Sequence, residues 1–487
     1  MRSRLPNLKA KLARLPGAER LRRIVATQRQ AEVYLVGGAV RDLLLKRRRG
    51  DLDFVVRGVP LTMLQQLLGK HGEVNLVGKT FGVLKFTPRG SKQELDIALP
   101  RTEHAFGTGG TRDVEVQSDA TLPLERDLER RDFTVNAMAV DLATGALIDP
   151  HGGLNDLAGE QLRAVGDPAE RFTEDNSRML RGLRFAIELG FTIEPKTWRT
   201  LKTLVLHLAA AVVPRELVSR EFLKAFAVDP LKTVDLWDLS GAFRAVMPEV
   251  LAMRGCPQHR PFHSEGDVWT HARLALEMAG SAAFKQFFKQ PPTLETMVAI
   301  FLHDVGKPLT TRTPEQHGTD RIRSDGHDVQ GARLAHRVLE RLRFSSYEGT
   351  VDADRVAWLV EHHMIALAAR EMRLSTLEKY FITDRKRGDE LLKLMLADGL
   401  ATISNRGRPT IGAFTVLQRR LATISRRPRP VAPLVRGDEL MRTLGLKSGP
   451  RVGELLDVLR DAQLEGKIKT KAAALTLARK LAGKRGR

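Results

Sequence analysis

The hydrophobic pattern of the chain changes character near residue 155. Before this point, short apolar runs bounded by turn residues predict strands at 33–36, 53–56, 74–77, 83–87, 94–98 and 137–142. Residues 41–46 between the first two runs predict a short helix, so we expect an α+β head with a mixed sheet that ends near Pro150. Helical periodicity dominates afterwards, at 174–190, 215–228, 268–280, 294–304, 328–343, 351–363 and 388–403.

The chain has 487 residues, which at roughly 100–200 residues per domain corresponds to three or four folding units. The segment SRRPRPVAP at 425–433 is typical of a linker, and 436–482 predicts a small helical tail. We therefore expect an α+β head followed by all-helical parts. The predicted divisions are a basic N-terminal extension 1–30, a head 31–150, a helical part 151–260, a second helical domain 261–405, and a linker with tail 406–487.

Composition narrows the class of protein. Lys and Arg exceed Asp and Glu by 79 to 58, a net charge of +21 that favours a polyanionic partner. Aromatic residues make up only 5%, which disfavours recognition of single-stranded RNA mainly by stacking. Cys256 is the single cysteine, so any metal must be held by carboxylates and histidines. No apolar run of the roughly 18 residues needed to span a membrane is found, and we expect a cytoplasmic protein.

Gly37 and Gly38 follow the first predicted strand and precede Arg41. Paired glycines allow backbone N–H groups to approach a phosphate, and the following helix N-terminus favours anions. A tight turn without a ligand is the more frequent explanation of such a pair taken alone.

Asp51 and Asp53 are two residues apart, and side chains at this spacing in a strand face the same side. Two adjacent carboxylates are typical ligands of Mg²⁺, and two such ions support nucleotidyl transfer. A solvated turn is the alternative, which the upstream glycine pair makes less favourable. Asp96 is a candidate third carboxylate or a surface aspartate.

Arg130-Arg131-Asp132-Phe133-Thr134-Val135-Asn136 is a second polar motif. Arginine pairs suit a triphosphate, because guanidinium is always charged and forks onto phosphate oxygens. Asp132 is a candidate to hold an arginine in place, and Asn136 to bond a ribose hydroxyl. The alternative is a surface charge cluster.

Asp175, Arg178, Arg181 and Arg184 recur every three residues in the predicted helix 174–190, for which Thr173 is the expected N-cap. Cytosine and adenine both place an exocyclic amine beside an acceptor ring nitrogen. A carboxylate accepts from that amine and an arginine donates to that nitrogen, so Asp175 with Arg178 would accept C and A but mispair with G and U. Arg181 and Arg184 would then serve phosphate or orientation. A salt-bridged solvent face is the competing interpretation.

Metal-ligating residue types gather in the second helical part, each on or beside an apolar helix: His271, His303, Asp304, His327, His362, His363 and Asp398. Imidazole and carboxylate together suit a divalent transition metal such as Mn²⁺, Ni²⁺, Co²⁺ or Fe²⁺. A lone histidine is usually a hydrogen-bonded core residue, whereas an adjacent His-Asp flanked by further histidines favours a metal site.

In this order, GGAVRD, D-x-D, RRDFTVNAMA and EDNSRMLRGLRF resemble class II tRNA nucleotidyltransferases and the related bacterial poly(A) polymerases over about 31–245. The resemblance implies a head, neck, body and tail architecture and addition of CCA to the tRNA 3′ end from CTP and ATP. It also implies that the Gly-rich stretch 101–126, which we expect to be mobile, helps to choose the nucleotide. It implies Mg²⁺ on Asp51 and Asp53, and nucleotide contacts at Gly38, Arg41, Arg131, Asp175, Arg178, Arg181 and Arg184.

Residues 262–400 resemble HD-superfamily phosphohydrolases, which occur in bacterial CCA-adding enzymes. Two other kinds of activity remain open. One is a relative restricted to CC, A or poly(A) addition. The other, from a different class, is an RNA-binding or nucleotide-sensing HD protein with an inactive head.

Overall fold

The computed structural model describes residues 8–15, 17–47, 51–77, 82–111, 113–210, 212–425 and 432–483. The chain divides into two compact units, Met1–Pro248 and Glu249–Arg487, which are treated separately below. Within the described ranges, no helix combines the length and the apolar character that a membrane crossing requires.

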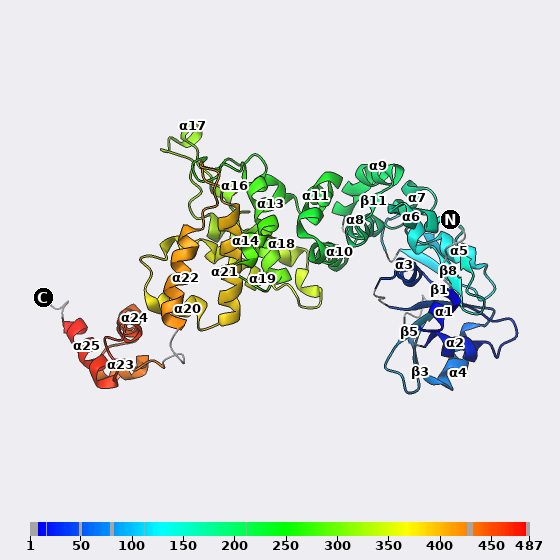
Figure 1. Ribbon diagram of the computed structural model, residues 1–487, viewed down its shortest axis with the longest axis horizontal. Coiled ribbons are helices and arrows are strands. Elements are labelled where there is room, and N and C mark those ends of the chain that lie inside the picture. The colour runs from blue at the N-terminus through cyan, green and yellow to red at the C-terminus, as the bar shows by residue number, and fades with distance from the viewer. Residues whose placement is uncertain are drawn as a thin grey trace. The chain divides into compact units, whose positions relative to one another are not determined.

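A mixed seven-stranded sheet forms the centre of the head, as predicted (Figure 1). Its spatial order is β3-β4-β5-β2-β1-β8-β9. The pairing of β2 with β5 is parallel and the other pairings are antiparallel. The strands are β1 (Glu32–Val36), β2 (Asp53–Arg57), β3 (Gly72–Val77), β4 (Val83–Pro88), β5 (Leu95–Ala98), β8 (Ala139–Asp141) and β9 (Leu147–Ile148). Apolar strand residues such as Leu35, Phe54 and Ile97 are almost completely buried, which is why these short runs form strands rather than loops.

Three helices of the head lie between these strands in the sequence: α3 (Gly38–Leu45), α4 (Leu61–Gly69) and α5 (Leu124–Glu129). The stretch 101–126, expected to be mobile, contains regular structure: β6 (Arg101–Ala105) and β7 (Val114–Ser118) form an antiparallel hairpin.

The basic N-terminal extension contains α1 (Leu8–Leu12) and α2 (Ala18–Val25). Their apolar residues, including Leu12 and Leu21, are buried, and α2 contacts β1 and α4. This segment therefore packs on the head, although nothing in its charge pattern indicates this.

Short and long helices follow the head within the first unit: α6 (Gly153–Ala158), α7 (Pro168–Glu174), α8 (Ser177–Leu189), α9 (Pro195–Leu204), α10 (Arg215–Val228), α11 (Pro230–Ser240) and α12 (Ala242–Val246). The expectation of an all-helical remainder needs one small correction, because the two-residue strands β10 (Gln161–Leu162) and β11 (Thr192–Ile193) pair in parallel.

The expected helix 174–190 is in fact two helices, and Thr173 is not its N-cap. Thr173 lies inside α7, where its hydroxyl donates to the Ala169 carbonyl. Asp175 has an extended backbone (φ −149°, ψ 102°) and ends α7, so α8 begins only at Ser177. The Asp167-Pro168 pair starts α7 instead, with the Asp167 carboxylate accepting from the Ala169 N–H.

Among the described residues of the second unit, the regular elements are helices, with isolated antiparallel bridges at Arg312–Arg323 and Ile403–Pro409. Its elements are α13 (Val268–Ala279), α14 (Ala282–Lys285), α15 (Leu294–Leu302), α16 (Lys307–Thr310), α17 (Pro314–His317), α18 (His327–Arg341), α19 (Ala353–His362), α20 (Leu374–Phe381), α21 (Arg385–Ala401), α22 (Gly412–Ser425), α23 (Gly437–Leu444), α24 (Pro450–Leu464) and α25 (Lys471–Gly483). Helices α23 to α25 share a small core around Leu440 and Leu455, which agrees with the predicted tail. The predicted linker lies largely outside the described residues, and the domain divisions proposed from the sequence stay predictions.

Candidate nucleotide and metal sites

A polar cleft of about 510 Å³ opens in the first unit, and most of the predicted nucleotide-site residues line it. They come from β2, β5, α3, the segment after α5, and α8 with Asp175 before it. These lining residues are Gly38, Arg41, Asp53, Asp96, Arg131, Asp132, Asn136, Asp175, Arg178 and Arg181. Gly37, Asp51 and Arg184 are not among its lining residues.

Gly37 provides the turn between β1 and α3. Its φ of 70° is in the left-handed region, and a Cβ there would lie 2.6 Å from the Arg131 Nη1 atom. A side chain at this position would therefore be strained and would also displace an arginine of the cleft. This gives the glycine a steric role beside the cleft.

Asp53 and Asp96 lie side by side at the cleft, because β2 and β5 are parallel and pair these two residues in register. Burial, together with the charges of Asp96 and Asp51, raises the pKa of Asp53 to about 6. Asp51 is exposed next to them. Partly buried carboxylates that repel one another fit a divalent cation, which would remove the unfavourable electrostatics.

Asp132 and Asn136 orient two arginines rather than pointing alone into the cleft. Asp132 accepts from Arg181 Nε at 2.7 Å and from the side-chain amide Nδ2 of Asn136 at 3.2 Å. The side-chain Oδ1 of Asn136 accepts from Arg41 Nη1 at 2.7 Å. Burial opposes the charge of Asp132, but Arg181 and these hydrogen bonds outweigh it and lower the pKa of Asp132 to about 2. The motif therefore forms a connected frame of charged groups.

Asp127 is a residue of this frame that sequence reasoning missed. It is completely buried and lies 2.9 Å from Arg130 Nη2 and 3.3 Å from Arg131 Nη2. Its surroundings in the sequence, LERDLERRD, are so rich in charge that they indicate a solvated helix. Only the tertiary fold distinguishes Asp127 from its neighbours.

Asp175 and Arg178 both line the cleft, although Asp175 precedes the helix. Asp175 accepts from the Ser177 N–H and from the Thr111 hydroxyl of the β6–β7 hairpin. Arg178 donates to Glu174 at 2.6 Å and to the Arg130 carbonyl at 3.1 Å. Both side chains are thus held in defined orientations at one end of the cleft.

Arg184 has a different environment from the other arginines of the predicted stripe. It is buried, donates to Glu221 at 2.5 Å and to Glu188 at 2.6 Å, and lies over the Phe185 ring at 4.0 Å. These contacts join α8 to α10, so we interpret Arg184 as a packing residue and correct its predicted nucleotide contact to that extent.

A group of imidazoles and carboxylates is buried in the second unit. His271, His303, Asp304, His327 and His363 are all buried, and Asp398 lies beside them. The Nε2 atoms of His271 and His303 are 3.2 Å apart, and those of His327 and His363 are 3.3 Å apart. Asp304 lies between the two pairs, 3.3 Å from His303 Nε2 and 3.3 Å from His327 Nε2.

The outer ring nitrogens show why this group fits a metal. The Nδ1 atoms of His303, His327 and His363 face the backbone carbonyls of Ile300, Ser324 and Val360 at 2.6–2.8 Å. Since a carbonyl only accepts, each Nδ1 carries the hydrogen, and a neutral ring then presents its Nε2 lone pair inward. Facing lone pairs repel unless a cation or proton lies between them. This is the usual arrangement of metal-ligating histidines.

The choice between His362 and His363 is resolved in favour of His363. The His362 ring stacks on Trp358 with centroids 4.5 Å apart, and its Nδ1 bonds to the Trp358 carbonyl. His362 therefore belongs to an aromatic contact within α19 and is not part of the clustered ligand groups, which contain His363.

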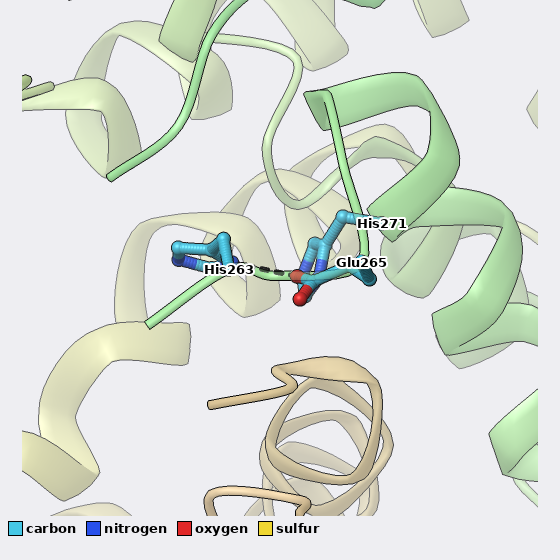
Figure 2. A group of neighbouring side chains, drawn as sticks. All are labelled: His263, Glu265 and His271. Atoms are coloured by element: carbon cyan, nitrogen blue, oxygen red, sulfur yellow. Dashed lines mark hydrogen bonds and ion pairs between the residues drawn. The ribbon is translucent and has the colours of Figure 1, made fainter. Parts of the chain in front are cut away.

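Two residues near this group were missed. Glu265 lies between His263 and His271, as Figure 2 shows, and all three offer ligand atoms close together. The spacing H-S-E in a loop before α13 carries no metal-site signature, so only the structure identifies it.

Comparison with known protein families matches both sites. Residues 33–163 match the Poly A polymerase head domain, and residues 268–403 match the HD domain. The fold and the two sites thus define a nucleotidyltransferase head combined with an HD domain.

The chain belongs to the family of multifunctional CCA proteins. It is 33% identical over 423 residues to the multifunctional CCA protein of Nitrosococcus oceani, covering 85% of this chain and 96% of that protein. With the Xylella fastidiosa (strain M12) protein of the same name it shares 35% identity over 314 residues, 64% of this chain and 69% of the relative. Among solved structures, the Thermotoga maritima CCA-adding enzyme complexed with tRNA has the same fold, with a TM-score of 0.61 at 21% identity over 97% of both chains.

Proposed function

We propose that this chain adds the nucleotides CCA to the 3′ end of tRNA, using CTP and ATP. The observation that carries the proposal is the single cleft that contains the glycine-turn residue Gly38, the paired carboxylates Asp53 and Asp96, and the base-selecting pair Asp175 and Arg178. Membership of the multifunctional CCA family gives the substrate class. We place the reaction in the cytoplasm, where tRNA and both nucleotides occur.

In this proposal Asp51 and Asp53 hold Mg²⁺, with Asp96 beside them. Two Mg²⁺ ions would polarise the attacking 3′-hydroxyl and neutralise the leaving pyrophosphate. Arg41 and Arg131 face the triphosphate, and the frame of Asp132, Asn136 and Asp127 fixes their guanidinium groups before the nucleotide binds.

Base selection rests with Asp175 and Arg178 in this proposal. Their acceptor and donor groups match the edges of C and A, whereas G and U present the reverse pattern and would leave two groups mispaired. Because the Thr111 hydroxyl and Glu174 already hold these side chains, little ordering is needed when the correct base arrives.

We propose that tRNA lies along the basic neck, body and tail. A net charge of +21 with 5% aromatic residues favours contacts to the phosphate backbone and to the shape of a duplex. The affinity for tRNA should therefore fall steeply as salt concentration rises, and an affinity independent of salt would contradict this part of the proposal.

The test uses three tRNA transcripts that end without CCA, without CA or without A, each incubated with labelled CTP or ATP singly. A CCA-adding enzyme incorporates CTP on the first two transcripts and ATP only on the third. Incorporation of CTP without ATP on any transcript would instead identify a CC-adding relative, and incorporation of ATP on the third transcript without any CTP incorporation would identify an A-adding relative. Long ATP runs would identify a poly(A) polymerase.

A second activity is favoured by the buried histidine group: we propose that the HD domain is a metal-dependent phosphohydrolase for phosphate ends such as a 2′,3′-cyclic phosphate. The ligands would be His271, His303, Asp304, His327, His363 and Asp398, and the ion would be Mn²⁺, Ni²⁺, Co²⁺ or Fe²⁺. A blocked tRNA 3′ end cannot be extended, because the attacking group must be a free hydroxyl. Hydrolysis of the P–O3′ bond by one water would free the 3′-hydroxyl and leave the phosphate as a monoester on O2′.

Hydrolysis of a cyclic-phosphate substrate is measured with each of the four metals, for the wild type and for Asp304→Ala. The substitution should remove hydrolysis and spare CTP incorporation, because the head supplies its own carboxylates. If the wild type hydrolyses nothing with any of these metals, the domain is a scaffold instead.

A further inference from the structure

Glu265 lies at the edge of the buried histidine group and is saturated with hydrogen bonds. Its Oε1 atom is 2.7 Å from His263 Nδ1 and 2.9 Å from His271 Nδ1 (Figure 2). Its Oε2 atom accepts from the Ile403 N–H at 2.9 Å. The side chain is only 4% exposed. Three donors converge on one buried carboxylate that comes from an irregular segment.

This arrangement fixes the orientation of the His271 ring. A carboxylate only accepts, so the Nδ1 atom of His271 carries the hydrogen and the Nε2 atom is the one that can bind a cation. That Nε2 atom lies 3.1 Å from Asp398 Oδ1 and 3.2 Å from His303 Nε2, inside the proposed ligand group. The other three rings direct Nδ1 to backbone carbonyls, so His271 is the one among them whose outer partner carries a full charge.

We propose that Glu265 is a positioning residue of the metal group, and that His263 in turn positions Glu265. The inference rests on the metal group of the proposed hydrolase, and it names the residues that orient one ligand of that metal. A charged partner on Nδ1 makes the opposite ring nitrogen a stronger donor to a metal and prevents the ring from turning. His263, whose side chain is 18% exposed, closes the outer side of the carboxylate.

The alternative is that Glu265 has only a structural role. Its hydrogen bond with the Ile403 N–H joins the segment before α13 to the residues that follow α21. A matched control exists in the adjacent residue. Ser264 also ties these segments together, through its hydroxyl to the Ser404 carbonyl at 3.0 Å and its N–H to the Ile403 carbonyl at 2.8 Å. Ser264→Ala removes the hydroxyl hydrogen bond without touching His271.

The experiment titrates the metal-depleted full chain with Mn²⁺ by calorimetry, takes the binding lost in Asp304→Ala as that of the histidine group, and records the thermal midpoint of the metal-free protein. Glu265→Gln should weaken Mn²⁺ binding by about 10–100-fold, the usual cost of losing an outer partner of a metal ligand. Ser264→Ala should bind Mn²⁺ as the wild type does, even where its thermal midpoint falls. CTP incorporation should be the same in all these variants.

His263 supplies a milder pair of variants in case Glu265→Gln does not fold. His263→Asn keeps an N–H near the position of Nδ1 and should retain Mn²⁺ affinity, whereas His263→Leu removes the donor and should weaken it several-fold, by less than the tenfold lower bound expected for Glu265→Gln. Loss of one bound ion per chain in His263→Asn would instead make His263 and Glu265 ligands of a separate ion and overturn the proposal.

Equal Mn²⁺ affinity in the wild type, Glu265→Gln and His263→Leu would also overturn the proposal, because only the structural role of Glu265 in joining the two segments would remain. The hydrolase proposal fails separately. If the wild type and its variants bind Mn²⁺ with the expected order of affinities but the wild type hydrolyses no phosphate end, the positioning role of Glu265 is supported and the hydrolase proposal is contradicted. If the wild type binds no more Mn²⁺ than Asp304→Ala does, both the positioning role of Glu265 and the hydrolase proposal are contradicted.

Discussion

The head cleft and the buried histidine group solve the problem of holding charge in different ways. In the cleft, arginines and aspartates compensate one another in a frame that exists before any ligand binds, as in the contact of Asp132 with Arg181. In the histidine group, Asp304 pairs with Lys307 Nζ at 2.6 Å and is surrounded by four inward Nε2 atoms at 3.3–3.8 Å, which have lone pairs to offer a cation. The cleft is thus organised to receive a large charged nucleotide, and the histidine group to receive a small cation.

Asp53→Ala should have the largest effect and separate the two regions completely. Loss of a carboxylate that holds a catalytic ion removes several kcal/mol of transition-state stabilisation, so CTP incorporation should fall by at least about 10³-fold. Binding of tRNA and hydrolysis of a cyclic phosphate should remain, because neither uses Asp53. Substantial incorporation by a folded Asp53→Ala protein would show that the metal ligands lie elsewhere.

Arg184→Ala should destabilise the first unit and leave nucleotide choice alone, which separates Arg184 from Arg178 and Arg181. Removing one partner of a buried ion pair costs about 3–5 kcal/mol, because Glu221 would be left buried without its arginine. Chemical denaturation measures this loss. The exposed Arg199→Ala is the control, and it should change the free energy of unfolding by less than about 0.5 kcal/mol.

A changed preference among nucleotides without a loss of stability in Arg184→Ala would return this residue to the nucleotide site and contradict its assignment as a packing residue.

Asp175→Ala should relax the choice of base. The lost acceptor contributes about 1.5–3 kcal/mol to a charged hydrogen bond, so relative use of UTP and GTP should rise on the order of 10²-fold at the upper end. Single-nucleotide incorporation with each of the four triphosphates measures it. Glu170→Ala, an exposed carboxylate of α7, is the control and should keep wild-type selectivity.

Unchanged selectivity in Asp175→Ala and Arg178→Ala together would reduce this helix junction to a structural contact.

The same contrast explains what the sequence could predict. Periodic apolar runs predicted six strands of the central sheet and most helices, because burial on one face gives a repeating pattern, whereas β6, β7 and β9 were missed. The metal group was also predictable in part, because His303 and Asp304 are adjacent in the sequence. The roles of Asp127, Glu265 and Arg184 were not, because their partners lie in other elements and a charged residue among other charged residues looks solvated. The early end of α7 at Asp175 escaped for a related reason, since the Thr111 contact comes from a distant hairpin.

The smallest expected effect is on the pH dependence of CTP incorporation. It tests whether Asp53 changes its charge near neutral pH while the frame of Asp132 and its arginines does not. Burial and the neighbouring charges of Asp96 and Asp51 raise the pKa of Asp53 to about 6. A raised carboxyl pKa means that protons compete with Mg²⁺ as pH falls through 6, because only the carboxylate binds the ion.

From pH 7.5 to 5.5 the ionised fraction falls about fourfold for a single group of this pKa. At subsaturating Mg²⁺, the rate of CTP incorporation should fall by a similar factor, and excess Mg²⁺ should restore it. Asp132, with a pKa of about 2, stays ionised throughout this range, so the arginine frame contributes nothing to the change. A rate that falls equally at saturating Mg²⁺ would place the titrating group outside the metal site.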